Sequence, residues 1–495
     1  MSIDRNTDLL TGQPLPARSM RPFLRSLWML VGGLVVACLA LVAVNLLSGP
    51  RLSDVEVDAT AVVSSANARL VLTTNRQLAD VTPEQVGIEP AAPFQVTTSG
   101  NSVVISFPQP LAYNTDYEVS VRGITGRAVD RQSTLSASFS TSEPSLYYLS
   151  RAQPPAEAGT RGADRILRTT TGSTDTEVAF ESANIQQFVP IGSELAVVTV
   201  NADLANTLYR VDADGTAEVL NLPGTGLVHD LQAAPGQSLL GFRFTSAADA
   251  AGPHYENVLF VLDLRTNAAK AVPDLEGDPL SVTTWGFMAN RADIVARQYD
   301  STLLLINPLD QSGGNPLETE PELEPAVPLG QFASLTAFAP DGVRIAVSDR
   351  DGQYVLDLSQ GTESAIVPQS VAGTTQYTAE LRFLAGGAGT DSAGYVQRIA
   401  EFDAATGSVR QYLSLVQGGE ARTVYAPASA RETIVGFELS PNDQYLAVQI
   451  VPNRDTELSD GYPVNTQATD VTTLFVNVAT GDVRRSVLGF DATWH

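Results

Sequence analysis

Short runs of alternating apolar and polar residues make up most of the chain from residue 145 onward. The runs are separated by turn residues, and no long helical spacing of apolar positions interrupts them. A period of two is typical of β-strands with one buried face, whereas an amphipathic helix repeats its apolar positions every three to four residues. The pattern therefore predicts an all-β fold over this part of the chain.

The predicted strands recur as copies of one unit. The two clearest copies are residues 338–347 and 439–448, and in each an apolar residue stands two places before a turn proline. The same anchor marks weaker copies at Phe188, Ala233, Phe287 and Phe383, and Trp494 begins a last one. Successive anchors are 45 to 56 residues apart. A repeat near 50 residues built from short strands is typical of a β-propeller.

One repeat shows the expected unit of four strands, at residues 332–338, 343–348, 352–358 and 363–367. Pro340 fixes φ in the first turn, and Asp341-Gly342 permits the tight reversal that follows. The stretch Ala339-Pro340-Asp341-Gly342, followed two residues later by Ile345-Ala346-Val347, resembles the TolB/WD40-like propeller family. That resemblance implies a ring of four-stranded blades.

The two ends of the repeat region complement each other. Residues 145–150, 165–169 and 177–180 are predicted as three strands of a blade that lacks its inner strand. Residues 490–494 are predicted as an inner strand with no strand after it. Pairing the two ends closes the ring and leaves no exposed sheet edge. We therefore expect a seven-bladed propeller over residues 145–495, with six or eight blades as the alternatives.

Residues 53–142 are predicted to form a separate β-sandwich, because short alternating runs and turn residues fill a segment of about the size of one such domain. The segment contains Leu111, Thr115-Asp116-Tyr117 and, at its end, Phe139-Ser140-Thr141. These residues resemble the bacterial Ig-like domain of the S-layer type. The loop at 125–130 departs from the Asp-x-x-Gly-Asn pattern of that family. The resemblance implies a spacer or an adhesive module.

An uncharged apolar run covers residues 26–47. Its 22 residues are enough for a helix to cross the roughly 30 Å hydrocarbon core of a membrane. Arg18, Arg21 and Arg25 precede the run, and basic flanks stay in the cytoplasm. We expect residues 1–25 to be a cytoplasmic tail, residues 26–47 to be a single-pass signal anchor of a bacterial cell membrane, and the rest to be extracytoplasmic.

Cys38, the only cysteine, lies inside this apolar run. Its surroundings, Val35-Val36-Ala37-Cys38, resemble a lipoprotein lipobox, but the residues after it stay apolar where mature lipoproteins turn polar. A lipidated Cys38 or a cleaved, secreted form remains an alternative to the uncleaved anchor. A single cysteine allows no internal disulfide and no cysteine-based metal cluster.

The extracytoplasmic part of the chain is strongly acidic. The whole chain has 30 basic and 55 acidic residues, a net charge of −25. Such a surface repels the phosphates of nucleic acids, so DNA and RNA are excluded as expected partners. Negative charge also keeps an exposed domain soluble, and this is the simpler explanation for it.

Four long connections are predicted on one face of the propeller. Residues 151–163, 246–256 and 452–471 join second to third strands, and the acidic, proline-rich stretch 310–330 is assigned between a fourth strand and the next inner strand. In a propeller these two kinds of connection share a face. Loops of this length are uncommon unless they are functional or disordered. The face is therefore a candidate binding surface, and tolerated insertions are the alternative.

The side chains give little sign of catalysis or metal binding. His229, His254 and His495 are isolated, and Ser392 lacks the glycine spacing of a nucleophile elbow. Residues 212–215 look briefly like a calcium loop but are predicted to be a hairpin turn. We expect no cofactor and no metal, and we expect Trp285 to be a core residue.

We therefore expect a non-enzymatic, membrane-anchored binding or scaffold protein whose loop-rich face binds an envelope protein, a peptide or a cell-wall glycan. The alternatives are a propeller hydrolase or lyase with carboxylates near the axis, and an envelope sensor. The candidate binding residues lie in two long loops: Asp455, Glu457, Asp460, Tyr462, His254 and Tyr255. The three acidic ones could hold calcium, although solvated loop carboxylates are the simpler expectation.

Overall fold

A computed structural model describes residues 27–39, 49–127, 129–154, 161–289, 291–308, 326–368, 374–385, 394–462 and 464–494. Residues 27–39 form a helix. The predicted tail 1–25 and the remainder of the predicted anchor, residues 26 and 40–47, lie outside the described residues. Within the described part of the chain, no helix combines the length and the apolar character that crossing a membrane requires.

The residues after position 50 first form a domain of two antiparallel sheets. One sheet has the strand order β1-β2-β5-β4 and the other has the order β3-β6-β7. Its elements are β1 (Leu52–Val57), α2 (Ala61–Ser64), β2 (Ala68–Thr74), η1 (Pro83–Gln85), β3 (Val86–Glu89), β4 (Gln95–Ser99), β5 (Ser102–Phe107), β6 (Asp116–Gly126) and β7 (Val129–Ser140). Apolar side chains alternate inward along the strands and form a single core, as the period-two pattern predicts.

The motif residues of this domain meet where β6 begins and β7 ends. Tyr117 pairs with Phe139 across the two strands, and their rings stack with centroids 5.5 Å apart. The Thr141 hydroxyl accepts a hydrogen bond from the Thr115 amide (2.9 Å) and donates one to the Ala112 carbonyl (2.7 Å). The Thr-x-Tyr and Phe-x-Thr positions therefore hold the two strands and the preceding loop together.

From Ser145 onward the structure is a β-propeller-like series of seven four-stranded antiparallel sheets. The first three sheets along the chain are β11–β14 (Ile185–Ile191, Glu194–Val200, Asn206–Val211, Ala217–Leu220), β15–β18 (Gly226–Ala233, Leu239–Ser246, Val258–Asp263, Ala268–Ala271) and β19–β22 (Val282–Phe287, Ile294–Gln298, Thr302–Ile306, Val327–Gln331). The next three are β23–β26 (Ser334–Phe338, Arg344–Asp349, Gly352–Asp357, Thr362–Ile366), β27–β30 (Thr374–Phe383, Tyr395–Asp403, Ser408–Gln417, Glu420–Tyr425) and β31–β34 (Thr433–Leu439, Tyr445–Val451, Thr472–Asn477, Val483–Leu488).

The seventh sheet joins the two ends of the propeller. It consists of β8 (Ser145–Ser150), β9 (Asp164–Thr170) and β10 (Thr176–Ser182), with β35 (Phe490–Trp494) paired to β8. Phe490 lies opposite Leu149, and Trp494 lies opposite Leu146. The inner strands contact one another in order around the ring: β35, β11, β15, β19, β23, β27, β31 and again β35. The predicted pairing of the C-terminal strand with the first blade is therefore present.

Every inner strand carries a shift in its pairing register with the second strand of its sheet. Such irregularities bend and twist a strand locally and leave one residue out of the ladder. In β35 the shift lies between Phe490 and Thr493, and Asp491 there adopts a positive φ of 50°. An aspartate tolerates this left-handed conformation better than most side chains do.

The propeller strands to which the sequence analysis gave bounds lie within about two residues of the observed ones. The four strands expected between 332 and 367 match β23 to β26, and the predicted anchors Ala233, Phe287, Phe383 and Trp494 each end an inner strand. Phe188 is the exception, because β11 continues to Ile191 before the turn at Gly192. Pro190, two places after Phe188, lies inside β11 and not in the turn, so the anchor at Phe188 is three residues before the end of the strand.

The assignment of residues 310–330 to a connection after a fourth strand is wrong. The fourth strand of that sheet, β22, is Val327–Gln331, so the long stretch lies between β21 and β22 instead. Residues 309–325 lie outside the described residues. A connection between third and fourth strands emerges on the opposite face from the loops at 151–163, 246–256 and 452–471. Only those three long connections therefore share a face.

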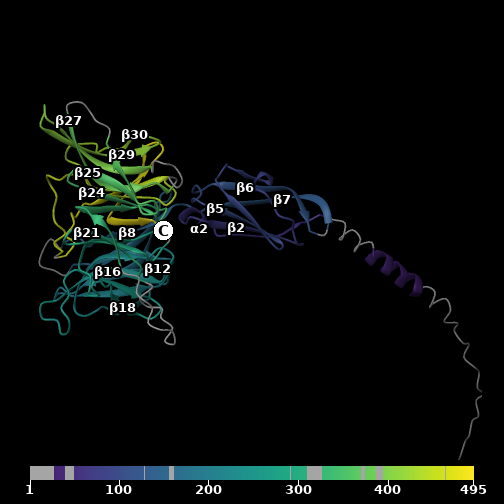
Figure 1. Cartoon of the computed structure of the whole chain (residues 1–495), viewed down its shortest axis with the longest axis horizontal. Coiled ribbons are helices and arrows are strands. Elements are labelled where there is room, and N and C mark those ends of the chain that lie inside the picture. Colours follow the sequence, from purple (N-terminus) through teal and green to yellow (C-terminus); the bar gives the residue numbers. More distant parts are fainter. Residues whose placement is uncertain are drawn as a thin grey trace, which may run out of the picture.

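The two-sheet domain lies beside the propeller, against the face that carries the turns between first and second strands (Figure 1). The Tyr113 amide donates a hydrogen bond to the Gln444 side-chain oxygen (2.8 Å), and the Asn442 side-chain amide donates one to the Leu111 carbonyl (3.0 Å). The rings of Tyr113 and Tyr445 also meet, with centroids 6.3 Å apart. The turn between β31 and β32 is therefore the docking point of the two-sheet domain.

Candidate functional site

The three long second-to-third-strand connections emerge on the face opposite this docking point, which we call the loop face. Residues 155–160 of the first connection and residue 463 of the third lie outside the described residues. In Figure 1 the loops in the colours of residues 246–258 and 452–471 extend away from the two-sheet domain. The loop face is thus the end of the propeller left uncovered by the rest of the described chain.

Two of the predicted binding residues, Asp455 and Glu457, are exposed on this face. Asp455 forms an ion pair with Arg431 (3.1 Å), and both side chains remain more than half exposed. Exposed pairs of this kind contribute at most about 1 kcal/mol. The expectation of solvated loop carboxylates describes these two residues well.

His254 and Tyr255 belong to a different loop and have different surroundings. His254 is exposed. The Tyr255 ring packs edge-on against Phe260, with centroids 5.0 Å apart, and also contacts Phe244. Tyr255 therefore anchors the β16–β17 loop to the core of its sheet, and only His254 of this pair is presented to solvent.

The expectation of a solvated carboxylate is wrong for Asp460. Asp460 is buried, and its carboxylate forms an ion pair with Arg151 at 2.7 Å, in which both side chains are less than 5% exposed. Arg151 follows β8, so this pair joins the 452–471 loop to the sheet that closes the ring. Burial of a charge is tolerated only when a partner of opposite charge and hydrogen bonds compensate it. Asp460 is therefore not available as a calcium ligand.

Tyr462 is also buried, and its hydroxyl donates to the Asp164 carboxylate, with oxygen distances of 2.5 and 2.6 Å. Asp164 also accepts hydrogen bonds from the backbone amides of Ala152 (2.9 Å) and Ile185 (2.8 Å). A single fully buried carboxylate at the start of β9 thus ties together the loop after β8, the inner strand β11 and the long 452–471 loop.

Two guanidinium groups lie on the Tyr462 ring. The Arg151 guanidinium carbon is 4.2 Å from the ring centroid, and that of Arg161 is 4.3 Å away. Arg161 also donates to the Asp460 carbonyl. Burial, with the Asp164 carboxylate adding to it, raises the pKa of Tyr462 to about 12, so the phenol stays protonated and donates its hydrogen bond. We call Arg151, Arg161, Asp164, Asp460 and Tyr462 the loop latch.

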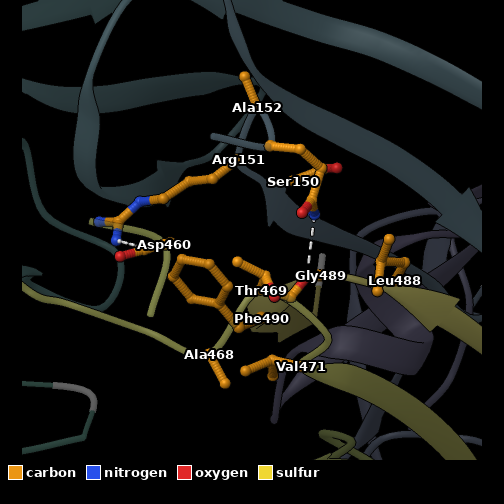
Figure 2. A pocket seen from close by; sticks show the side chains of 11 residues that line it. Ser150, Arg151, Ala152, Asp460, Ala468, Thr469, Val471, Leu488, Gly489 and Phe490 are labelled. Atoms are coloured by element: carbon orange, nitrogen blue, oxygen red, sulfur yellow. Dashed lines mark hydrogen bonds and ion pairs between the residues drawn. The ribbon is translucent and has the colours of Figure 1, made fainter. Parts of the chain in front are cut away.

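A cavity lies next to the latch, lined by Arg151, Asp460, Thr469 and Phe490 among others (Figure 2). Its volume is about 20 Å³, which is room for little more than one water molecule. In Figure 2 the Arg151 side chain extends to Asp460, and the Phe490 ring lies next to it. The latch is therefore a structural tie at the base of the loop face, and no ligand of larger size fits beside it.

Charged side chains also gather on two inner strands. Arg382 of β27 forms ion pairs with Glu380 of the same strand (2.8 Å) and with Glu438 of β31 (2.7 Å). Burial raises the pKa of Glu380, while the charge of Arg382 works in the opposite direction. Both glutamates thus have a cationic partner, which stabilises their charged forms.

Asp491 differs from these paired carboxylates. It lies at the irregular position of β35, and its backbone amide donates to the Gln449 side-chain oxygen (3.1 Å). Burial raises the pKa of Asp491 to about 6, although the positive charge of Arg151 lowers it in part. A carboxyl that titrates near neutral pH is suited to proton transfer. Asp491 is therefore a catalytic candidate on the ground of its pKa alone.

The expectation of no metal site rests on the isolated histidines. His229 is half-buried on β15, and burial lowers its pKa, with Arg243 contributing. His495 and Ser392 lie outside the described residues. Within the residues that the structure describes, no three His, Cys, Asp or Glu side chains are grouped so as to hold a metal ion.

A wide groove of about 830 Å³ separates the two-sheet domain from the turn face of the propeller. Its walls include α2 on one side and Pro190, Pro235 and Trp494 on the other. The arginines in these walls are paired: Arg210 contacts Glu194 at 2.6 Å, and Arg265 contacts Asp263 at 3.0 Å. The Asp58 carboxylate, also in these walls, accepts hydrogen bonds from the Thr60 and Ala61 amides. The groove is therefore a gap between two docked domains whose described charged side chains already have partners within the protein.

Sequence reasoning located the loop face but missed the latch arginines and Asp164. Arg151 and Asp460 are 309 positions apart in the chain, and Tyr462 and Asp164 are 298 apart. No local spacing connects such residues. The one available signal was the predicted ring closure, which brings the end of β8 next to the last blade.

Comparisons with known proteins identify no family. No protein-family model matches the chain, and no curated protein matches it. Among solved structures it is similar to the β-propeller domain of the Trilobed protease from Pyrococcus furiosus, at 13% identity and a TM-score of 0.39, over 66% of this chain and 95% of that one.

Two further solved structures show a similar degree of likeness. The β-propeller domain of Cps50 (Swd1) from Myceliophteria thermophila has 12% identity and a TM-score of 0.38, over 64% of this chain and 90% of that one. Dihydro-heme d1 dehydrogenase NirN has 11% identity and a TM-score of 0.36, over 70% and 74% of the two chains. At this level of similarity, no activity is inferred from any of the three structures.

Proposed function

We propose that the protein is a non-enzymatic, membrane-anchored binding protein of a bacterial envelope, and that its loop face binds an envelope protein, a peptide or a cell-wall glycan. The observation that carries this proposal is the docking of the two-sheet domain on the opposite face, through Tyr113, Asn442 and Gln444. The domain covers the turns and leaves the long loops open to partners.

The finer architecture in this proposal is a signal anchor at residues 26–47, an Ig-like domain at 53–142 and a closed seven-bladed propeller at 145–495. The uncharged run of 22 residues after three arginines supports the anchor. The packing of Thr115, Tyr117, Phe139 and Thr141 supports the Ig-like assignment. An anchor on the N-terminal side of the Ig-like domain directs the loop face away from the membrane.

A second candidate function is an enzyme of the hydrolase or lyase kind. The observation that favours it is Asp491, whose pKa burial raises to about 6. Against it stands the pairing of the other inner-strand carboxylates, Glu380 and Glu438, with Arg382. A hydrolase that uses two carboxylates needs a second one with a separate role.

The test is protection of exposed side chains by bound envelope material. The full chain is mixed with isolated bacterial envelopes, and oxidative labelling is read at Leu458, Tyr299 and Tyr377 on the loop face and at Val219 and Val483 on outer strands. We expect protection of the first three side chains and unchanged labelling of the last two. Absence of binding, or protection that spares the loop face, contradicts the proposal. Turnover of a substrate that is lost in Asp491→Asn would favour the enzyme instead.

A further inference from the structure

A groove of about 390 Å³ opens between the sheet β23–β26 and the sheet β27–β30. Its walls come mainly from β27 to β30 and include Gln376, Gln397, Tyr412 and Ser414. Pro368, after β26, and Pro427, after β30, mark its mouth. Both lie in connections that lead from a fourth strand to the next inner strand, so the groove opens on the loop face.

The inner walls of this groove are buried and polar. Gln397 is 1% exposed, Ser414 is 5% exposed, and Gln353 of the neighbouring sheet is 6% exposed. The Gln397 amide donates to the Gln353 side-chain oxygen, which joins the two sheets. Ser414 lines the groove, so its hydroxyl is available to a ligand there.

The junction of these two sheets is apolar only in part. Its apolar cluster includes the small residues Ala337, Ala339 and Ala346, together with Leu381 and Phe383 at the end of β27 that faces the turns. In the half of the junction nearer the loop face, amides and hydroxyls line the groove together with apolar side chains such as Ile399 and Val416. Polar side chains at a packed junction weaken the hydrophobic contribution to stability. The polar side chains at this junction are therefore not explained by packing between the two sheets.

The polar groups at the groove mouth form a neutral network. The Glu401 carboxylate is paired with Arg410 at 2.7 Å and is almost fully buried. The Gln376 amide donates to the Tyr412 hydroxyl (3.1 Å) and to Glu401 (3.3 Å). The charge of Glu401 thus cancels that of Arg410, and Gln376 and Tyr412 add an amide and a phenol that both donate and accept hydrogen bonds. Arg422 also lines the groove, and its guanidinium donates to the Val478 carbonyl.

We propose that this groove binds a neutral, polyhydroxylated ligand, such as a sugar unit of a cell-wall glycan. The inference rests on the proposed binding function and assigns its ligand class. Sugar hydroxyls donate and accept in the same way as the amides and hydroxyls of the wall, and the volume lies within the usual range of about 300–1,000 Å³ for small-ligand sites. An anion would find the guanidinium of Arg410 already paired with Glu401.

A peptide fits the groove less well than a sugar does. An extended peptide is recognised most often by adding a strand to a free sheet edge or by apolar side-chain pockets. Here the polar wall lies on the faces of β28 and β29, whose backbones are already paired on both sides. The side chains of the wall, and not a strand edge, are therefore available to a ligand.

The experiment titrates the full chain, in a detergent that contains no sugar, with an N-acetylglucosamine tetramer and with maltohexaose in a calorimeter. We expect one of the two sugars to bind. Tyr412→Phe and Gln376→Ala each remove one hydrogen-bonding group and should raise Kd about tenfold. Thr423→Trp, on the outer strand beside Ser414, fills the groove without removing a buried group and should abolish binding.

Matched controls separate a ligand effect from a folding effect. Tyr209→Phe makes the same change on the third strand of another sheet, and Val483→Trp places a tryptophan on another outer strand. Both should leave Kd within about twofold, because neither residue lines the groove. The circular dichroism spectrum and Tm of Thr423→Trp should match those of the parent chain.

Several results would overturn the inference. If neither sugar binds, or if Thr423→Trp binds as tightly as the parent chain, the groove is not the sugar site. Binding of an envelope peptide that Thr423→Trp abolishes, while neither sugar binds, would also contradict it. Loop-face protection by envelopes would persist in these cases, and the proposed binding function would then stand without this site. If envelopes also fail to protect the loop face, both the proposed binding function and the proposed sugar site are contradicted.

Discussion

Asp455 and Asp460 show how burial alone separates two carboxylates of one loop. Asp455 pairs with Arg431 in solvent, and Asp460 pairs with Arg151 in the protein interior. A solvated carboxylate keeps its hydration when its partner is lost. When one member of a buried pair is lost, the other is left as an uncompensated charge in the protein interior. The resulting loss of stability is far larger than the net contribution of the intact pair.

Asp460→Asn is therefore predicted to lower the free energy of unfolding by about 3 kcal/mol, because it leaves the Arg151 guanidinium buried without its counter-ion. Asp455→Asn should change it by no more than about 0.5 kcal/mol. Urea unfolding of the two variants measures the difference. Limited proteolysis should also cut the 452–462 stretch faster in Asp460→Asn. Equal stability of the two variants would show that the latch contributes nothing.

A second residue-scale prediction concerns Asp491. Burial raises its pKa from 3.8 to about 6, so the folded chain holds the proton more tightly than the unfolded chain does. The resulting stability is present below about pH 4 and is lost as the pH rises through 6. Asp491→Asn cannot ionise, and asparagine also tolerates the positive φ at this position. The variant should gain a few degrees in Tm at pH 7 and little or nothing at pH 4.

Thermal unfolding at both pH values tests this expectation. Asp214→Asn is the matched control, since Asp214 is exposed in the turn between β13 and β14. It should shift Tm by less than about 1 °C at either pH, as surface substitutions usually do. A loss of stability in Asp491→Asn at pH 7 would mean that the carboxylate makes a favourable ionic contact in the folded chain.

At the scale of elements, the contact between the two-sheet domain and the turn of β31 and β32 contains a buried hydroxyl without a partner. The Tyr113 hydroxyl is buried and has no hydrogen-bond partner among the residues that the structure describes, and burial raises its pKa. Tyr113→Phe keeps the ring contact with Tyr445 and removes this unsatisfied group. We expect a gain of about 1 kcal/mol in the free energy of unfolding, since an unsatisfied hydroxyl costs about that much or more.

Tyr117→Phe is the matched control, and it is expected to change the free energy of unfolding in the opposite direction. The Tyr117 hydroxyl accepts a hydrogen bond from the Ala112 amide at 3.1 Å, so its removal should cost about 1 kcal/mol. Urea unfolding of both variants makes the comparison. If Tyr113→Phe is as destabilising as Tyr117→Phe, then the Tyr113 hydroxyl is satisfied by water and not orphaned.

The elements themselves were predictable because their signals are local. Strand alternation and the Pro-Asp-Gly turn after Phe338 depend on neighbouring residues, and β23 to β26 match their predicted positions closely. The two errors have one origin. After Phe188, Pro190 resembles a turn residue but lies inside β11, and after β21 the short strand β22 directly follows a long acidic stretch that has no strand pattern. A strand whose ends are not marked by clear turn residues is difficult to place from the sequence.

The candidate sites were much less predictable than the strands. The latch joins residues about 300 positions apart, and the polar groove depends on which faces of β28 and β29 meet the neighbouring sheet. Gln397 and Ser414 are ordinary strand residues in the sequence, and only their burial makes them unusual. Contacts that the ring closure creates have no counterpart in local sequence patterns.

At the scale of the whole molecule, one short strand completes the ring. β35 pairs with β8 and buries Phe490 and Ala492, and its neighbours on either side around the axis are β31 and β11. Burial of an aromatic side chain of this kind contributes about 1.5–3 kcal/mol. The latch acts at the same junction, since Arg151 leaves the end of β8 and contacts the loop of the preceding sheet.

Removal of residues 490–495 is therefore predicted to have a far larger effect than its length suggests. The free edge of β8 would be open to pairing with other chains, and the cores on both sides of the missing strand would be exposed. We expect aggregation or a loss of stability of at least about 5 kcal/mol, comparable with the total stability of many domains. Light scattering and thermal unfolding measure both effects. Removal of residue 495 alone leaves β35 in place, so it should change neither the light scattering nor the Tm. If the 1–489 chain is monomeric and keeps the parent Tm, then ring closure is dispensable and other contacts hold the loop face in place.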